Sequence, residues 1–237
     1  MTDQAVPASS ASTVTTRSPV LELAGVSKRY PGPPAVDALR DVTLSVHPGE
    51  MVAISGPSGS GKSTLLNILG LLDTPTSGTH LLAGKPTNGL RERELTRLRA
   101  SSIGFVFQSF HLVPYLDSVR NVALPLIHQG RPRRARRDLA VAALASVGLG
   151  HRLYARPTTM SGGEQQRVAI ARAIVHEPAL LLCDEPTGNL DSTNTDTVLR
   201  LLRGLVVADR AVVVVTHDAR VEQSADRVIR VVDGRAS

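Results

Sequence analysis

The chain has 237 residues, of which 42% are hydrophobic and 20% charged, as in soluble globular proteins, and its formal net charge is +6. A single cysteine excludes an intrachain disulfide, and the longest apolar runs fall far short of the ~18 residues that a membrane-spanning helix needs. Since 3% of the residues are aromatic, no platform for stacking on bases is expected, and we predict no nucleic-acid partner.

The N-terminal segment MTDQAVPASSASTVTTRSP is small and polar, and it lacks the basic start and apolar middle of a signal peptide. We interpret residues 1–19 as a disordered leader of a cytoplasmic protein and residues 20–237 as its folded part. The first two patterns of this part, VLEL at 20–23 and ALRDVTLSV at 38–46, have the alternation of edge or meander strands.

Strand and helix patterns then alternate, which predicts a mostly parallel sheet with helices packed against it. The strand patterns are MVAIS, IGFVFQ, ALLLCDE, AVVVVTH and RVIRVVDG, which start at residues 51, 103, 179, 211 and 227. A helix is expected over 62–72, and the block 109–176 has no convincing strand. We therefore predict an α/β fold with a mixed sheet core, an antiparallel β subdomain and an inserted helical subdomain at about 109–176.

Five arginines fall within seven residues of the helical block: Arg131, Arg133, Arg134, Arg136 and Arg137. Such a cluster can bind nucleic acid or anionic lipid, or it can be the solvated first turn of an amphipathic helix. We favour the helix, because the pattern DLAVAALASVGLG continues from the cluster and aromatic residues are scarce. Contact with lipid headgroups stays open if the protein sits beneath a membrane.

The nine residues GPSGSGKST fit the pattern G-x-x-x-x-G-K-[ST], with an apolar strand before them and a helix after them. Glycines let backbone N–H groups wrap a triphosphate, Lys62 places a positive charge on the β- and γ-phosphates, and the Ser63 hydroxyl ligates Mg²⁺. The loop predicted to bind a nucleoside triphosphate consists of Gly56, Pro57, Ser58, Gly59, Ser60, Gly61, Lys62, Ser63 and Thr64.

Polar residues end three of the predicted central strands. Asp184 is predicted to meet the metal ion directly or through water, and Glu185 to polarise an attacking water as general base. Gln108 could hold water and metal, and His217 could hydrogen-bond the phosphate and position Glu185. Because the carboxyl ends of parallel strands meet at one edge of a sheet, these side chains are expected to converge near one γ-phosphate.

A second glycine-bearing loop, TTMSGGEQQR at residues 158–167, also has the form of an anion site at a helix N-terminus. One nucleotide does not need two such loops, so the residues alone leave open which phosphate the second loop binds. A kinase with the same first loop would leave this second loop unexplained.

With the order SGGEQQR, CDEP, GNLD and THD, the sequence over about residues 20–234 closely resembles the ATP-binding subunit of ABC transporters. The resemblance implies a P-loop ATPase fold of the ABC type, with ATP and Mg²⁺ as cofactors. It also implies a dimer in which Ser161, Gly162 and Gly163 of one copy contact the γ-phosphate held by the other copy, with Gln165 beside them. Met160 stands where leucine is usual in this family.

Two further roles follow from the same resemblance. Asp191 in GNLD corresponds to a residue of the loop that crosses the dimer interface. Tyr30 in SKRY lies at the position of the aromatic residue that stacks on adenine.

The segments IGFVFQSFHLVPYLDSVRNVALPL and DEPTGNLDS look most like the branch that includes lipoprotein-releasing, macrolide-exporting and cell-division ATPases. This implies a peripheral subunit at the cytoplasmic face of the inner (plasma) membrane, bound to an integral-membrane permease with few transmembrane helices. Two functions stay open: ATP-driven export or extraction of a lipophilic or peptide substrate, and a mechanical switch that regulates an extracytoplasmic partner without moving cargo.

Overall fold

The computed structural model describes residues 18–237, so the leader predicted over residues 1–19 lies outside the described residues except for its last two. The strands in chain order are β1 (Leu21–Tyr30), β2 (Val36–Val46), β3 (Met51–Ser55), β4 (Ser77–Leu82), β5 (Lys85–Pro86), β6 (Ile103–Phe107), β7 (Leu180–Asp184), β8 (Ala211–Val215), β9 (Arg227–Val232) and β10 (Arg235–Ala236). The helices are α1 (Lys62–Leu69), α2 (Glu92–Ser102), α3 (Ser118–His128), α4 (Arg133–Ser146), the 3₁₀ turn η1 (Pro157–Thr159), α5 (Gly162–Ile174), α6 (Ser192–Gly204) and α7 (Ala219–Ser224).

A six-stranded sheet forms the centre of the fold, in the order β10-β9-β3-β8-β7-β6. Every pair in it is parallel except β10 with β9, so the sheet is mixed, as the sequence predicts. The strands β3, β7 and β8 are apolar along nearly their whole length and almost wholly buried, because helices cover both faces of the sheet.

The second sheet is antiparallel and has the order β2-β1-β4-β5. Its long pair β1 and β2 confirms the strands expected from the two alternating segments, although β1 extends to Tyr30, well past the predicted end. The strands β4 and β5 and the helix α2 were not predicted. In β4 the sequence SGTHLL starts with exposed polar residues, and only His80 and Leu82 are buried, so an apolar pattern is hardly visible there.

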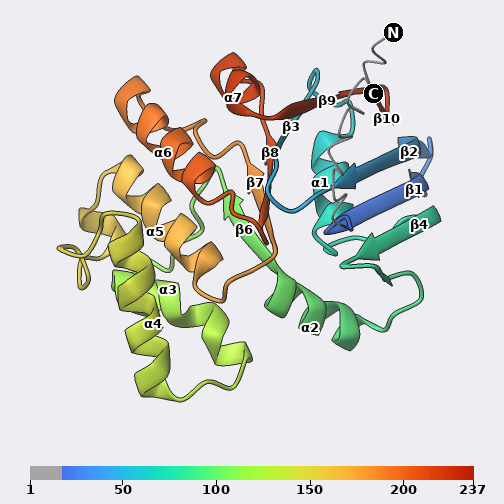
Figure 1. Ribbon diagram of the computed structural model, residues 1–237. Helices are drawn as coiled ribbons and strands as arrows, with labels where there is room; N and C mark the ends of the chain where they lie inside the picture. The colour runs from blue at the N-terminus through green and yellow to red at the C-terminus, as the bar shows by residue number, and fades with distance from the viewer. Residues whose placement is uncertain (1–17) are drawn as a thin grey trace, which may run out of the picture.

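The two faces of the central sheet pack into two separate apolar cores. Val52 and Ile54 of β3 point to the core that contains α1 and the strands β1 and β2. Met51 of β3, together with Leu181 and Cys183 of β7, points to the core formed with α3, α4, α5 and α6. Because side chains alternate along a strand, α1 and α5 lie on opposite faces of one sheet, as Figure 1 shows.

The helical subdomain consists of α3, α4, η1 and α5, inserted between β6 and β7. Its helix α4 begins at Arg133, so four of the five clustered arginines lie at the mostly exposed start of an amphipathic helix, as expected, and Arg131 lies just before it. Met160, the residue before the second glycine loop, is buried in the core that includes these helices. Within residues 18–237, no helix is both long enough and apolar enough to cross a membrane.

Candidate functional site

The loop Gly56–Thr64 connects β3 to α1, and its backbone allows only glycine at two positions. Gly56 has φ 151° and Gly61 has φ 106°, in the left-handed range that other residues rarely adopt. A Cβ atom at Gly56 would overlap the carbonyl oxygen of Val231, and one at Gly61 would overlap that of Ala38. The neighbouring backbone therefore approaches this loop so closely that a side chain does not fit at these two positions.

Lys62, the first residue of α1, folds back into the loop. Its Nζ donates hydrogen bonds to the carbonyl oxygens of Gly56 at 2.9 Å and Pro57 at 2.8 Å. The ammonium group is therefore held at the centre of the loop, at the positive end of the helix, where an anion would be favoured.

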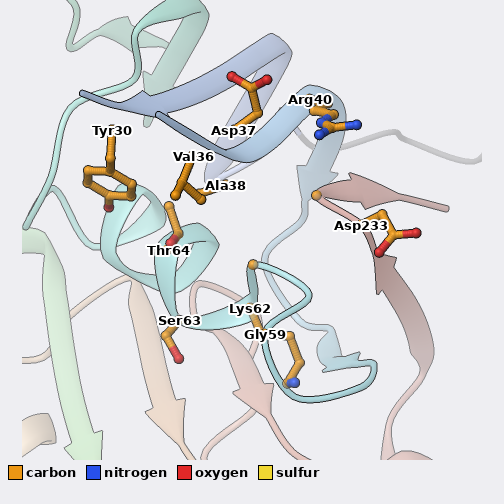
Figure 2. A pocket seen from close by; sticks show the side chains of 12 residues that line it. Tyr30, Val36, Asp37, Ala38, Arg40, Gly59, Lys62, Ser63, Thr64 and Asp233 are labelled. Atoms are coloured by element: carbon orange, nitrogen blue, oxygen red, sulfur yellow. The ribbon is translucent and has the colours of Figure 1, made fainter. Parts of the chain in front are cut away.

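A cavity of about 540 Å³ opens beside this loop. Its walls come from three places: the loop and the start of α1, the strands β1 and β2, and the turn between β9 and β10 (Figure 2). It is lined by Tyr30, Val36, Asp37, Ala38, Arg40, Gly59, Gly61, Lys62, Ser63, Thr64, Asp233 and Gly234.

The loop and Tyr30 were predicted from the sequence, but the remaining walls of the cavity were not. The segment Val36–Arg40 lies in a strand with an ordinary alternating pattern, and Asp233 and Gly234 form a hairpin turn near the C-terminus. Neither segment carries a motif, because these residues form a wall by position and not through a particular chemistry.

The polar residues that follow the central strands do converge. Phe107 of β6 pairs with Asp184 of β7, which in turn pairs with Val215 of β8, so the three strands end level with one another. Gln108, Glu185 and Thr216 come directly after these paired positions, and His217 one residue later.

Glu185 and His217 form the closest pair in this group. His217 Nδ1 lies 2.8 Å from Glu185 Oε1. The backbone of Glu185 has φ 44°, and its N–H donates to the carbonyl oxygen of Val215 at 2.9 Å. A left-handed glutamate is uncommon, and here it turns the side chain towards His217 at the end of the sheet.

The carboxyl group of Asp184 lies in an unfavourable environment for a negative charge. Burial and the adjacent Glu185 raise its pKa above the ordinary value, although Lys62 partly opposes this. A divalent cation would relieve both effects, and carboxylate and hydroxyl oxygens are the ligands that Mg²⁺ prefers. Asp184 and Ser63 therefore fit a magnesium ion by their chemistry.

Gln108 lies against the loop that follows β7. Its Nε2 donates to Asn189 Oδ1 at 3.3 Å, and Asn189 Nδ2 donates back to the carbonyl oxygen of Gln108 at 3.1 Å. A Cβ atom at Gly188 would come within 2.7 Å of Gln108 Nε2, so a larger residue there would make the Gln108 amide shift. Gln108 therefore joins the end of β6 to the segment that follows β7, and its role at a metal ion stays a prediction.

The second glycine loop, Ser161–Gly163, opens α5. The Ser161 hydroxyl accepts a hydrogen bond from Glu164 N at 3.2 Å, and Glu164 Oε2 accepts one from Ser161 N at 2.9 Å, which is a complete capping box. Arg152 supports Glu164 through an ion pair of 3.0 Å. Gln165 Nε2 donates to the carbonyl oxygen of Met160 at 3.2 Å, so the helix start is fixed in place.

This loop contacts the segments around Gln108 and Asp191. The position of a Cβ atom at Gly162 is 3.6 Å from Leu190 and 3.9 Å from the Phe110 ring, and one at Gly163 would overlap the Asn194 side chain. Asn194 is itself held by Asp191, which caps α6 and accepts from Asn194 N at 2.8 Å.

The two glycine loops do not share one site within a chain. The described residues that line the cavity include none of those in the second loop. The first loop starts α1, which packs on one face of the central sheet, and the second starts α5, which packs on the other.

Two residues of α5 that were not predicted from the sequence connect this helix to the segments that follow β7 and β6. The fully buried Gln166 donates from Nε2 to the carbonyl oxygen of Pro186 at 2.6 Å, next to Glu185. Arg172 donates to the carbonyl oxygens of Phe110 at 2.7 Å and His111 at 2.6 Å, two consecutive residues with positive φ. The sequence did hold a signal for Gln166, since it is a polar residue on the apolar face of the predicted helix.

A glycine loop between the strand β3 and the helix α1, with its lysine folded into the loop and carboxylates at the end of β7, two strands away in the same sheet, defines the class of P-loop nucleotide-binding proteins. Residues 39–188 match the family described as ABC transporter. The chain therefore belongs to the ABC transporter family, as its ATP-binding domain.

The chain is also similar to curated proteins. It is 48% identical over 219 residues to the macrolide export ATP-binding/permease protein MacB of Burkholderia lata, an alignment that covers 92% of this chain and 32% of that protein. It is 49% identical over 213 residues to MacB of Rhodopseudomonas palustris, covering 90% of this chain and 32% of that protein. The chain spans about a third of the length of these relatives.

Two solved structures share the fold. The dimeric ATP-binding cassette MJ0796 bound to ADP and Pi aligns with a TM-score of 0.83 and 43% identity, over 92% of this chain and 96% of the other. The cbiO1 protein of Clostridium perfringens, part of the ABC transporter complex cbiONQ, aligns with a TM-score of 0.83 and 28% identity, over 93% and 88%. The predicted family and fold class are confirmed.

Proposed function

We propose that this chain hydrolyses ATP in a dimer in which two copies enclose two nucleotides, and that it drives a membrane permease. The observation that carries the proposal is the position of the second glycine loop. Ser161–Gly163 forms a complete helix N-terminus, yet it lies away from the cavity of its own chain. A second copy, turned to face the first, supplies a phosphate for it.

Each residue then has a task in the reaction. The loop N–H groups and Lys62 bind the phosphates, and Ser63, Asp184 and Gln108 would hold Mg²⁺, which when bound neutralises charge on the β- and γ-phosphates. Glu185 accepts a proton from the attacking water, and His217, 2.8 Å from it, keeps its carboxylate oriented. Ser161 and Gly162 of the opposite copy donate to the γ-phosphate.

The relatives support the transport part of the proposal. MacB of Burkholderia lata is named as a macrolide export ATP-binding/permease protein, and MJ0796 is described as dimeric and as an ABC transporter cassette. We infer that this chain works at the cytoplasmic face of the inner membrane, with a second copy of itself and an integral-membrane permease. Export or extraction of a lipophilic or peptide substrate is the function that fits these relatives best.

The dimer is tested with Glu185→Gln, which keeps the side-chain shape but removes the general base. We expect this variant to be monomeric alone or with ADP, and to form a stable dimer with ATP and Mg²⁺, as measured by light scattering on a size-exclusion column. The exposed Glu177→Gln is the matched control and should hydrolyse ATP like the parent chain. A Glu185→Gln chain that stays monomeric at saturating ATP contradicts the shared site.

A further inference from the structure

Tyr30, the last residue of β1, is held by a second side chain behind the wall of the cavity. Its hydroxyl donates a hydrogen bond of 2.7 Å to Asp73 Oδ2. Asp73 lies in the connection between α1 and β4, and it is not among the described residues that line the cavity. The phenol ring is therefore fixed at both ends, by β1 at Cα and by Asp73 at the hydroxyl.

Both oxygens of the Asp73 carboxylate are in use. Oδ1 accepts from Lys28 Nζ at 2.6 Å and from Thr74 N at 2.7 Å, while Oδ2 accepts from Tyr30. Although burial acts to raise it, the hydrogen bonds from Lys28 and Tyr30 hold the pKa of Asp73 below its ordinary value. The carboxylate is therefore charged at neutral pH and accepts all three hydrogen bonds at once.

Lys28 also covers one face of the tyrosine ring. Its Nζ lies 4.8 Å from the ring centroid, within the range of a cation–π contact, and its side chain is only 12% exposed. The same ammonium group donates to the carbonyl oxygen of Thr74 at 2.8 Å. Like Asp73, Lys28 is absent from the described cavity lining, so the face that it covers is not the one turned to the cavity.

We propose that Asp73 and Lys28 are positioning residues for the nucleotide base: together they set the angle of the Tyr30 ring and leave it one free face for stacking. The proposal rests on the proposed function, because it takes Tyr30 as the residue against which the base stacks. Figure 2 shows the Tyr30 ring beside Thr64 and Val36 at the wall of the cavity, some way from Lys62 at the phosphate loop. Fixing the ring therefore affects the base and not the phosphates.

Asp73→Asn tests this inference. An asparagine is uncharged and has one accepting oxygen, so when that oxygen serves Lys28 and Thr74, Tyr30 loses the charged acceptor to which its hydroxyl donates. Affinities for ADP and for inorganic pyrophosphate, which has no base, are measured by calorimetry. We expect roughly fivefold weaker binding of ADP, the loss of about one net hydrogen bond, and unchanged binding of pyrophosphate. The exposed Asp138→Asn is the matched control and should change neither affinity.

The same substitution in a Tyr30→Phe chain separates positioning from a general effect on the fold. Because Tyr30→Phe already lacks the hydroxyl, Asp73→Asn should weaken ADP binding less than twofold further there. An equal loss in both backgrounds, or a loss of pyrophosphate binding, overturns the inference. Lys28→Met is the second variant, and it should also weaken ADP but not pyrophosphate; equal affinity to the parent chain contradicts the role of Lys28.

Failure of the proposed function gives a different result. If Tyr30→Ala binds ADP and pyrophosphate as the parent chain does, Tyr30 does not contact the base at all, and both the base site and the inference are wrong. If Tyr30→Ala weakens ADP selectively while Asp73→Asn and Lys28→Met do not, the base site stands and only the positioning role fails.

Discussion

The two glycine loops of this chain each start a helix, but they differ in how the helix is capped and in what surrounds them: Gly61 precedes α1 with a left-handed backbone and no side-chain cap, whereas Ser161 caps α5 through its hydroxyl. The loop Gly56–Thr64 forms one wall of a cavity and carries its own lysine, whose ammonium group donates hydrogen bonds to two carbonyl oxygens of the loop. The loop Ser161–Gly163 has no lysine, and its serine is exposed. We therefore propose that the first loop is a nearly complete phosphate site, whereas the second supplies one side of a site that another copy of the chain completes.

The glycines themselves show the same difference. Gly56 and Gly61 are required by their own chain, because neighbouring carbonyl groups leave no room for a Cβ atom. A Cβ atom at Gly162 would meet its neighbours at 3.6 Å or more, an ordinary contact distance, and the backbone there has no positive φ. Since the fold does not demand Gly162, we propose that its small size serves a group that approaches from outside the chain.

The largest predicted effect separates helix capping from phosphate binding at Ser161. Asp caps helices as well as Ser does, so Ser161→Asp should change the melting temperature little, but its charge repels a γ-phosphate. We expect the ATPase rate to fall roughly 100-fold or more, as when a donor to a reacting anion is removed. Ser161→Asn, which caps the helix without adding a charge, is the matched control, and its ATPase rate should fall less. Equal ATPase rates for the two variants would contradict the binding of a phosphate at this loop.

A second prediction compares two adjacent glycines. Gly162→Ala should leave thermal unfolding nearly unchanged and lower the ATPase rate at least tenfold, roughly what a displaced reacting group costs. Gly163→Ala forces the Asn194 side chain, which donates to the capping residue Asp191, to move and should cost about 1–3 kcal/mol of stability. The contrast is read from unfolding in urea and phosphate release on the same samples. A destabilised Gly162→Ala would mean that the fold, and not a ligand, requires this glycine.

The smallest predicted effects are on the free energy of unfolding, and they have opposite signs at Asp184, at the end of β7, and at Glu164, beside the second loop. The pKa of Asp184 is raised by burial and by Glu185, so its charge destabilises the free chain at neutral pH. Asp184→Asn should therefore gain roughly 0.5 kcal/mol of stability, a small value because the carboxyl group is partly solvated. This gain should shrink as the pH falls through the raised pKa towards the ordinary 3.8.

Glu164, beside the second loop, behaves in the opposite way. The backbone hydrogen bond from Ser161 lowers its pKa against the effect of burial, and Arg152 lowers it further. The negative charge of Glu164 therefore stabilises the fold at pH values above 4.5, the ordinary pKa of the group, and this stabilisation is lost as the pH falls through the lowered pKa. Glu164→Gln should cost roughly 0.5 kcal/mol at neutral pH. Unfolding curves at several pH values check both variants, and a shared sign would contradict this electrostatic difference.

The sequence predicted the parts of the fold that carry strong local patterns. The apolar strands β3, β7 and β8 and the glycine loop between β3 and α1 were found because each is wholly apolar or has a fixed spacing. The strand β4 was missed because its burial comes from pairing with β1 and not from its own pattern. The helix α2 was missed as well, since Leu95 is its one fully buried residue.

The candidate site shows the same limit. Residues to which a motif assigns a role, such as Lys62 and Glu185, are predicted from the sequence, and their roles stay predictions. Gln166, Arg172 and Asp73 act on other residues through distant contacts, to Pro186, to the segment after β6 and to Tyr30. Such partners are 20 or more positions apart, so only the folded chain brings them together.

The central claim, that each site is built from the first loop of one copy and the second loop of the other, is tested by mixing two inactive variants. Lys62→Ala removes the first loop's function and Ser161→Asp the second's. Each variant alone has two defective sites, but a mixed dimer has one site with both loops intact. We predict that the mixture releases phosphate well above the sum of the separate variants, with a maximum near equal amounts. A mixture that stays at that sum at every ratio contradicts the shared site.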